Sequence, residues 1–82
     1  GLESTKSVSL NIWDNLNHST LRIDLWTEEM SVVEMKRFYI DVIGGMAQTI
    51  LNATGDEYMS EEMKDLCDRR VKHVNEENKG SL

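Results

Sequence analysis

Two adjacent glycines, Gly44 and Gly45, lie inside the longest helical pattern of this chain, and no other feature constrains its fold as strongly. The pattern covers residues 31–52 and reads SVVEMKRFYIDVIGGMAQTILN. An interior glycine costs a helix about 1 kcal/mol relative to alanine, so a chain that keeps two gains something from the missing side chains. The expected gain is the close approach of another backbone. Three explanations stay open: packing on a sheet within one subunit, contact with a helix of a second subunit, or a functional kink.

The sequence also marks the two ends of this helix and its apolar side. Ser31 and Glu34 match a capping box, in which each side chain accepts a hydrogen bond from the other residue's backbone N–H. Gly55 suits the left-handed position that commonly follows a helix. Apolar residues recur every three or four positions and predict a core or interface stripe: Met35, Phe38, Tyr39, Val42, Met46 and Ile50. Gly45 neighbours this stripe, and Gly44 lies to its side.

Before this helix, alternating apolar and polar residues predict two strands with a turn between them. Every second residue is aliphatic in both segments: Val8, Leu10 and Ile12, then Leu21, Ile23 and Leu25. This period of two is typical of half-buried strands. The segment from Asp14 to His18 is rich in turn-forming residues, so an antiparallel hairpin is the simplest arrangement. Two strands alone are marginally stable in water, and further strands are therefore expected, from an N-terminal segment or from a partner subunit.

Trp13 and Trp26 fall on the side of the hairpin opposite the aliphatic residues, near its two ends. If the sheet is covered on one side only, both side chains are exposed to solvent. Two explanations stay open. Either helix ends or a further strand cover the two rings, or the rings form a ligand or partner surface, since tryptophan is enriched in binding hot spots.

A second helix is predicted over residues 60–74, with Ser60 at its N-cap and acidic residues in its first turn, where negative charge is favourable. Its apolar stripe is Met59, Met63, Leu66 or Cys67, Arg70 or Val71, and Val74. The expected fold is a single α+β domain over residues 1–82, in which an antiparallel sheet packs against the long helix and the second helix. Residues 1–6 and 76–82 are expected to be flexible.

Size and charge restrict the partners of the chain. A chain of 82 residues buries only about 60–65% of its unfolded surface, so it is marginally stable without a supplement. Its single cysteine excludes an internal disulfide, which leaves a homo-oligomer, a dimer or higher, as the expected supplement. With 15 acidic against 9 basic residues, the chain repels phosphate backbones and anionic lipid. Neither a nucleic acid nor an anionic membrane surface is therefore an expected partner. Membrane insertion is not expected either, because no apolar run is long enough to span a bilayer.

No constellation of residues in the sequence points to catalysis or to a cofactor. A metal site needs three or four converging ligands, and Cys67 and His73 point to different faces of their helix. His18 and His73 are expected to be solvated. Cys67 is expected to be an inert packed thiol, since it falls on the apolar side of the second helix. The chain is predicted not to be an enzyme and to hold neither metal nor cofactor.

Four segments of the chain are distinctive when taken together: SLNIWD at 9–14, TLRIDLWT at 20–27, EMKRFYIDVIGGMAQTILNATGDEYM at 34–59 and EEMKDL at 61–66. They resemble the gliding motility-associated protein GldC family. The resemblance extends from about Leu2 to His73, and the third segment is specific. Members of that family usually carry a further N-terminal stretch of about two strands, which this chain lacks, so the expected sheet has more strands than can be read here.

The resemblance implies an accessory role in bacterial gliding, in support of other gliding-motility proteins and without a known enzymatic activity. It also implies a cytoplasmic protein, in agreement with the absence of a visible signal peptide. The order of strands, long helix and second helix is analogous to that of SecB-type export chaperones, which supplies an alternative: a small oligomeric holdase or adaptor for unfolded or partner chains. The predicted interface residues are Gly44, Gly45, Met35, Phe38, Tyr39, Val42, Met46, Trp13 and Trp26. The helix around the two glycines is the first choice of interface, and the strand edge is the second.

Overall fold

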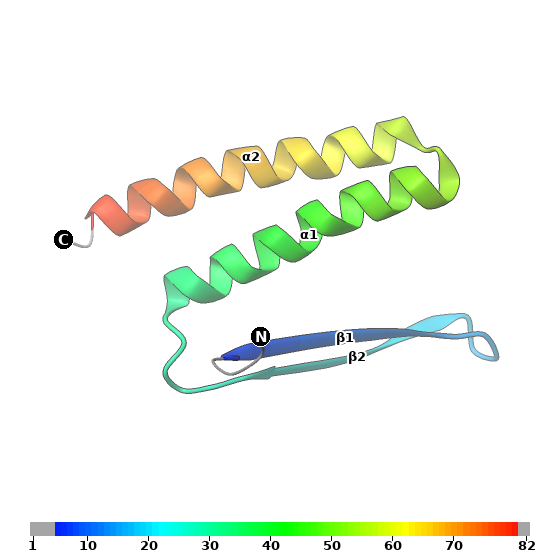
Figure 1. The fold of residues 1–82 in the computed structure, drawn as a ribbon, viewed down its shortest axis with the longest axis horizontal. Coiled ribbons are helices and arrows are strands. Elements are labelled where there is room, and N and C mark those ends of the chain that lie inside the picture. Colours follow the sequence, from blue (N-terminus) through cyan, green and yellow to red (C-terminus); the bar gives the residue numbers. More distant parts are fainter. Residues whose placement is uncertain (1–4, 81–82) are drawn as a thin grey trace. The chain divides into compact units, whose positions relative to one another are not determined.

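The computed structural model describes residues 5–80, in which two strands are followed by two helices. The chain divides between Ser31 and Val32 into two compact units, one holding the strands and the other the helices (Figure 1). We call them the β-hairpin and the helical hairpin. A two-stranded antiparallel sheet followed by two helices confirms the predicted α+β class. Of the ends predicted to be flexible, residues 1–4 and 81–82 lie outside the described residues.

The β-hairpin pairs β1 (Ser7–Asp14) with β2 (Ser19–Trp26) in antiparallel register. Opposite each other across the pair lie Val8 and Leu25, Leu10 and Ile23, and Ile12 and Leu21. Side chains alternate between the two faces of a strand, and each aliphatic residue of β1 lies opposite an aliphatic residue of β2. The pairing therefore brings all six aliphatic residues to one side, which we call the aliphatic face. The predicted hairpin and its period of two are confirmed.

Asp14 organises the turn between the strands. Its Oδ1 accepts hydrogen bonds from the backbone N–H groups of Leu16 at 2.9 Å and Asn17 at 3.3 Å, and its Oδ2 accepts one from Asn17 Nδ2 at 2.8 Å. His18 completes the loop in the left-handed region, at φ 51°. A carboxylate that accepts from the following N–H groups stabilises a turn without help from glycine. The bond from the Asn17 side chain, followed by the two backbone bonds, holds the pKa of Asp14 below its ordinary value of 3.8.

Acid is expected to weaken the β-hairpin through Asp14. Since its pKa is lowered on folding, the ionised form contributes stability that is present above the ordinary value of 3.8 and is lost as the pH falls through the folded-state pKa. The melting temperature followed by tryptophan fluorescence should therefore fall over that range. In the variant Asp14→Asn the titrating group is gone, and the melting temperature should change less. An equal fall in both proteins would show that other carboxyl groups cause the acid sensitivity.

The helical hairpin joins α1 (Val32–Thr54) to α2 (Glu57–Gly80) through two residues. Gly55 has φ 74°, which confirms the left-handed position predicted for it at the end of α1. Asp56 caps α2, because its Oδ1 accepts a hydrogen bond from the backbone N–H of Met59 at 2.9 Å. A glycine that ends one helix and an aspartate that starts the next therefore reverse the chain within two residues.

The prediction for the bounds of α2 was wrong. The helix begins at Glu57 instead of Ser60, and it continues past the predicted end near Val74. The segment DEYMSEE contains two residues that suit an N-cap, and the earlier one, Asp56, starts the helix. Ser60 is consequently an interior helical residue. It is buried, and its Oγ donates a hydrogen bond to the backbone carbonyl of Ala47 in α1 at 2.9 Å.

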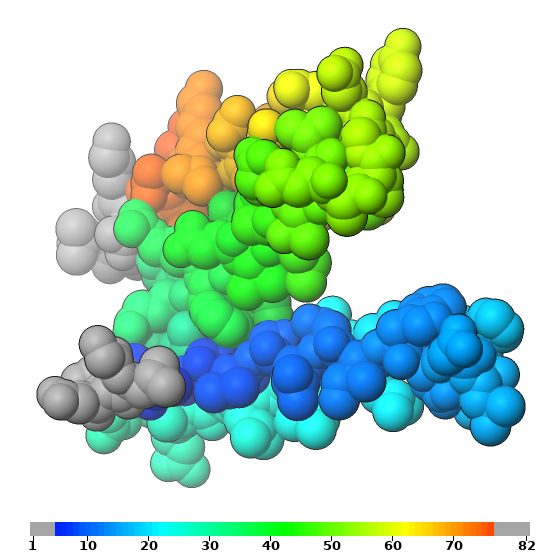
Figure 2. All heavy atoms as spheres, turned by 45° about the vertical axis from the view of Figure 1, so that its right-hand side comes forward, coloured from blue at the N-terminus to red at the C-terminus, as the bar shows by residue number. Residues whose placement is uncertain are grey.

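Small side chains form the core between α1 and α2. Ala47 and Ser60 are 0% and 1% exposed, and Cys67 and Val74 are also buried. Besides the Ser60 bond, a second contact crosses to an α1 carbonyl, since Cys67 Sγ lies 3.4 Å from the Ile40 oxygen and donates to it. Figure 2 shows the two helices in contact near their connecting turn, in green and yellow. Small side chains at these positions let the two helix backbones approach each other closely.

Candidate functional site

The aliphatic face of the β-hairpin is widely exposed. Its six side chains range from 47% exposed at Leu10 to 63% at Leu25. Soluble proteins rarely leave contiguous apolar patches of more than a few hundred Å² in water unless another surface uses them. Covering one half-exposed aliphatic side chain contributes roughly 1 kcal/mol. An occupant of this face would therefore gain several kcal/mol, which makes the face a strong candidate for a contact surface.

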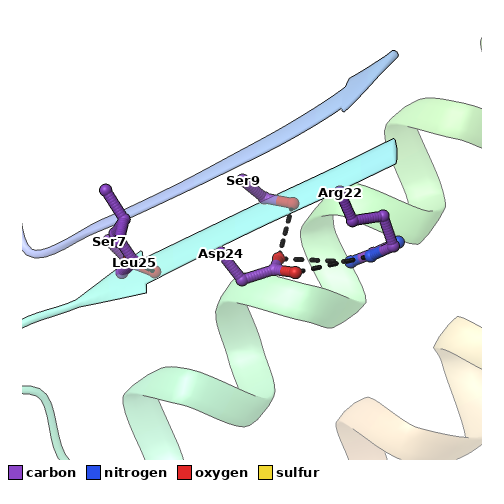
Figure 3. A network of polar contacts seen from close by, with 5 residues as sticks. All are labelled: Ser7, Ser9, Arg22, Asp24 and Leu25. Carbon is purple, nitrogen blue, oxygen red and sulfur yellow. Dashed lines mark hydrogen bonds and ion pairs between the residues drawn. The ribbon is translucent and has the colours of Figure 1, made fainter. Parts of the chain in front are cut away.

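The opposite face of the β-hairpin is polar and internally bonded (Figure 3). Ser9 Oγ on β1 donates to Asp24 Oδ1 on β2 at 2.9 Å, and Arg22 Nη2 reaches the same oxygen at 3.2 Å. Arg22 Nε lies 3.4 Å from Asp24 Oδ2. An exposed ion pair of this kind contributes little to stability. Its effect is to give this face satisfied polar groups, in contrast to the aliphatic face.

The structure places Trp13 and Trp26 on the polar face, as predicted, but it does not bring them together. Trp13 lies opposite Thr20 and Trp26 lies opposite Ser7, so they are near different ends of the β-hairpin. The two indoles are 59% and 60% exposed. The ring of Trp13 contacts His18 edge to face, with centroids 6.2 Å apart. The two tryptophans therefore offer two separate exposed aromatic surfaces instead of one site.

Gly44 and Gly45 have different surroundings in the helical hairpin. A Cβ added to Gly44 would lie 3.9 Å from Cys67 Sγ, an ordinary van der Waals distance to α2. A Cβ added to Gly45 would meet nothing within 4 Å. The nearest group at Gly44 is thus a side chain, and no backbone approaches either position closely within the described part of the chain. An interface at Gly45 stays a prediction that needs a second molecule.

The predicted stripe on α1 borders the contact with α2. The backbone carbonyls of Ile40 and Ala47 accept bonds from α2, and two members of the stripe, Met35 and Tyr39, line a groove between the two helices. Its members are half-buried except for Met46, which is 38% exposed. Within the stripe, the rings of Phe38 and Tyr39 meet edge to face with centroids 5.0 Å apart. The stripe is therefore an apolar surface beside the contact between the helices, which it reaches at Met35 and Tyr39.

Cys67 is the buried thiol of the helix–helix core. Burial raises its pKa, and the negative charges of Asp68 and Asp41 raise it further. The neutral thiol is a poor nucleophile, so this environment suits packing better than reaction. Among the described residues, no group of three or more His, Cys, Asp or Glu side chains is placed to hold a metal ion. The prediction of an inert thiol agrees with these surroundings.

Sequence reasoning missed a groove of about 460 Å³ between the two helices. We call it the α1–α2 groove, and its lining is Met35, Lys36, Tyr39 and Ile40 from α1 with Arg70, His73 and Val74 from α2. Periodicity assigned Met35 and Tyr39 to an interface stripe and left His73 as a solvated surface residue. The spacing of Arg70, His73 and Val74 on one side of α2 was a usable signal. The sequence did not reveal which side of α2 meets α1.

The model of one protein family matches residues 1–76, and its description is gliding motility-associated protein GldC-like. The match spans the whole β-hairpin and most of the helical hairpin. No match was found among curated proteins or among solved structures. No helix in the described part of the chain combines the length and the apolar character needed to cross a membrane.

Proposed function

The chain belongs to the GldC-like family of gliding motility-associated proteins, and we propose that it acts in gliding as a non-enzymatic accessory protein through protein–protein contacts. The observation that carries this proposal is the aliphatic face, where six side chains are each about half exposed. Covering exposed aliphatic side chains with another apolar surface lowers the free energy of the system, so a face of this kind favours association. The proposed occupants are a further copy of this chain, in a dimer or higher oligomer, and other gliding-motility proteins. The proposed location is the cytoplasm.

The placement of titratable groups favours contact over catalysis. Among the described residues, pKa values depart clearly from their ordinary values at Asp14 and Cys67. Asp14 belongs to the turn of the β-hairpin and Cys67 to the core of the helical hairpin, so each shift has a structural cause. Active sites are usually marked by several perturbed groups that converge in one cleft. We therefore propose no reaction for this protein.

The proposal is tested with two adjacent substitutions on β2. Leu21 lies on the aliphatic face and Thr20 on the polar face, and both are exposed, so neither Leu21→Asp nor Thr20→Asp should disturb the isolated chain. Only the first places a charge in the proposed contact. In a gliding bacterium that lacks its own copy, Thr20→Asp should restore gliding and retain the partners captured with the wild-type protein. Leu21→Asp should do neither, while circular dichroism shows an unchanged fold.

If Leu21→Asp restores gliding and captures the same partners as Thr20→Asp, the aliphatic face does not carry the function. A specific observation also favours a second candidate, a SecB-type holdase or adaptor: Trp13 and Trp26 are exposed on the other face of the β-hairpin, so both faces offer apolar surface to an unfolded chain. A holdase should suppress the aggregation of unrelated heat-denatured proteins near equimolar ratio. The accessory protein proposed first should not.

A further inference from the structure

We propose that the α1–α2 groove binds a short acidic and apolar peptide segment of a partner protein. The inference rests on the proposed function, since it names the chemistry of one partner contact. The groove belongs entirely to the helical hairpin and has a volume of about 460 Å³. That volume falls within the roughly 300–1,000 Å³ of typical ligand sites. It is large enough for the side chains of a short peptide and too small for a folded domain.

The floor of the groove is apolar. Ile40 and Tyr39 from α1 are half-buried, and Val74 from α2 is buried. Met35 adds a flexible thioether to the same floor. Methionine adapts its shape to different partners, and tyrosine offers a rigid amphipathic surface. An aliphatic or aromatic side chain of a peptide is the group that this floor accommodates.

The rim of the groove carries two cations, Lys36 on α1 and Arg70 on α2. His73 stands one turn from Arg70, and all three side chains are exposed. No carboxylate lines the groove among the described side chains. The whole chain has a net charge of −6, so this groove has the opposite sign to the protein as a whole. Charge complementarity therefore points to an occupant that carries carboxylates next to its apolar side chains.

Charge also favours a peptide over an extended polyanion. A net charge of −6 repels a membrane surface or a nucleic acid, which presents many negative charges at once. A short peptide presents only a few carboxylates, and these contact the rim directly. The guanidinium of Arg70 is suited to this role, since its planar donors match a carboxylate in a bidentate geometry.

The test uses the full chain and a fluorescein-labelled peptide composed of leucine and glutamate. Two matched peptides replace either the glutamates with lysine or the leucines with serine. Fluorescence anisotropy should show saturable binding of the first peptide that weakens as salt is added. The two matched peptides should bind at least about tenfold more weakly, a loss of about 1.4 kcal/mol. Equal binding of the glutamate and lysine peptides would overturn the inference.

Two charge reversals on α2 locate the binding. Arg70→Glu reverses a charge on the rim, whereas Lys72→Glu makes the same change to the charge of the chain outside the groove lining. Both residues are exposed, so both variants should fold. Arg70→Glu should raise the Kd of the leucine–glutamate peptide about tenfold, because it replaces an attraction by a repulsion. Lys72→Glu should change the Kd less than about twofold.

Equal effects of the two reversals would overturn the groove as the binding site. The failure of this inference is also distinguishable from failure of the proposed function. If the peptide does not bind, yet Leu21→Asp still abolishes gliding, the contact function stands without the groove. If the peptide binds as expected, yet Leu21→Asp has no effect on gliding, peptide binding by the groove is supported and the contact function of the aliphatic face is contradicted.

Discussion

Replacing Val74 with aspartate is expected to unfold the helical hairpin. Val74 is 4% exposed and belongs to the core between α1 and α2. A carboxylate at a buried position costs about 3–5 kcal/mol unless a buried partner compensates it. The basic groups on the rim of the α1–α2 groove are exposed, so they offset little of this cost. The core of a chain this small supplies no more than about 3–5 kcal/mol in total. The variant Val74→Asp should therefore lose its cooperative thermal transition and most of its helical circular dichroism at room temperature.

The matched control for this prediction is the same change at Val71. Val71 is on the same helix, three residues earlier, but its side chain is 42% exposed. The charge of Val71→Asp can stay hydrated, so the free energy of unfolding should fall by less than about 1 kcal/mol. A similar loss in both variants would show that charge or helix propensity, and not burial in the core, decides stability. Unchanged melting of Val74→Asp would contradict the helix–helix core described above.

The second large effect is expected from Gly45→Leu, which should turn the proposed oligomer into a monomer. In the single chain a Cβ on Gly45 meets nothing within 4 Å, and the residue lies beside the apolar stripe of α1. Gly45 is exposed and a side chain there begins in open space, so a leucine should be tolerated in the monomer, and only a second molecule packed against Gly45 would clash with it. The mass measured by light scattering should fall to that of one chain, with helical circular dichroism retained.

Two alanine variants provide the controls for this experiment. A Cβ on Gly44 makes an ordinary contact 3.9 Å from Cys67 Sγ, so Gly44→Ala should be tolerated inside the subunit. Gly45→Ala adds one methyl group at the proposed interface. Each substitution should stabilise α1 by up to about 1 kcal/mol through helix propensity. If Gly45→Leu keeps both the mass and the melting temperature of the wild-type protein, α1 does not form the interface around Gly45.

Local chemistry explains why most elements were predictable. The β-hairpin follows from two aliphatic rows with the same period, and the carboxylate of Asp14 fixes where the chain turns. The end of α1 follows from Gly55, because glycine adopts φ 74° at little cost. Signals of this kind act over a few residues and need no tertiary contact. They fail where two signals compete, as at Asp56 and Ser60, and there the start of α2 was predicted one turn late.

The sequence by itself determined the strand pairing, the two helices and the apolar rows on each of them, because these depend on short-range sterics and on side-chain periodicity. Only the tertiary structure decided which of these apolar residues are buried between the helices and which stay exposed. Cys67 is buried in the helix–helix core, whereas Leu66 is exposed. Gly44 lies next to α2, and Gly45 has no neighbour within 4 Å of an added Cβ. The tertiary structure also built the cationic α1–α2 groove from positions more than 30 residues apart, such as Lys36 and Arg70. Periodicity states which residues share a side of a helix, whereas the rotation of one helix against another depends on packing between segments distant in sequence.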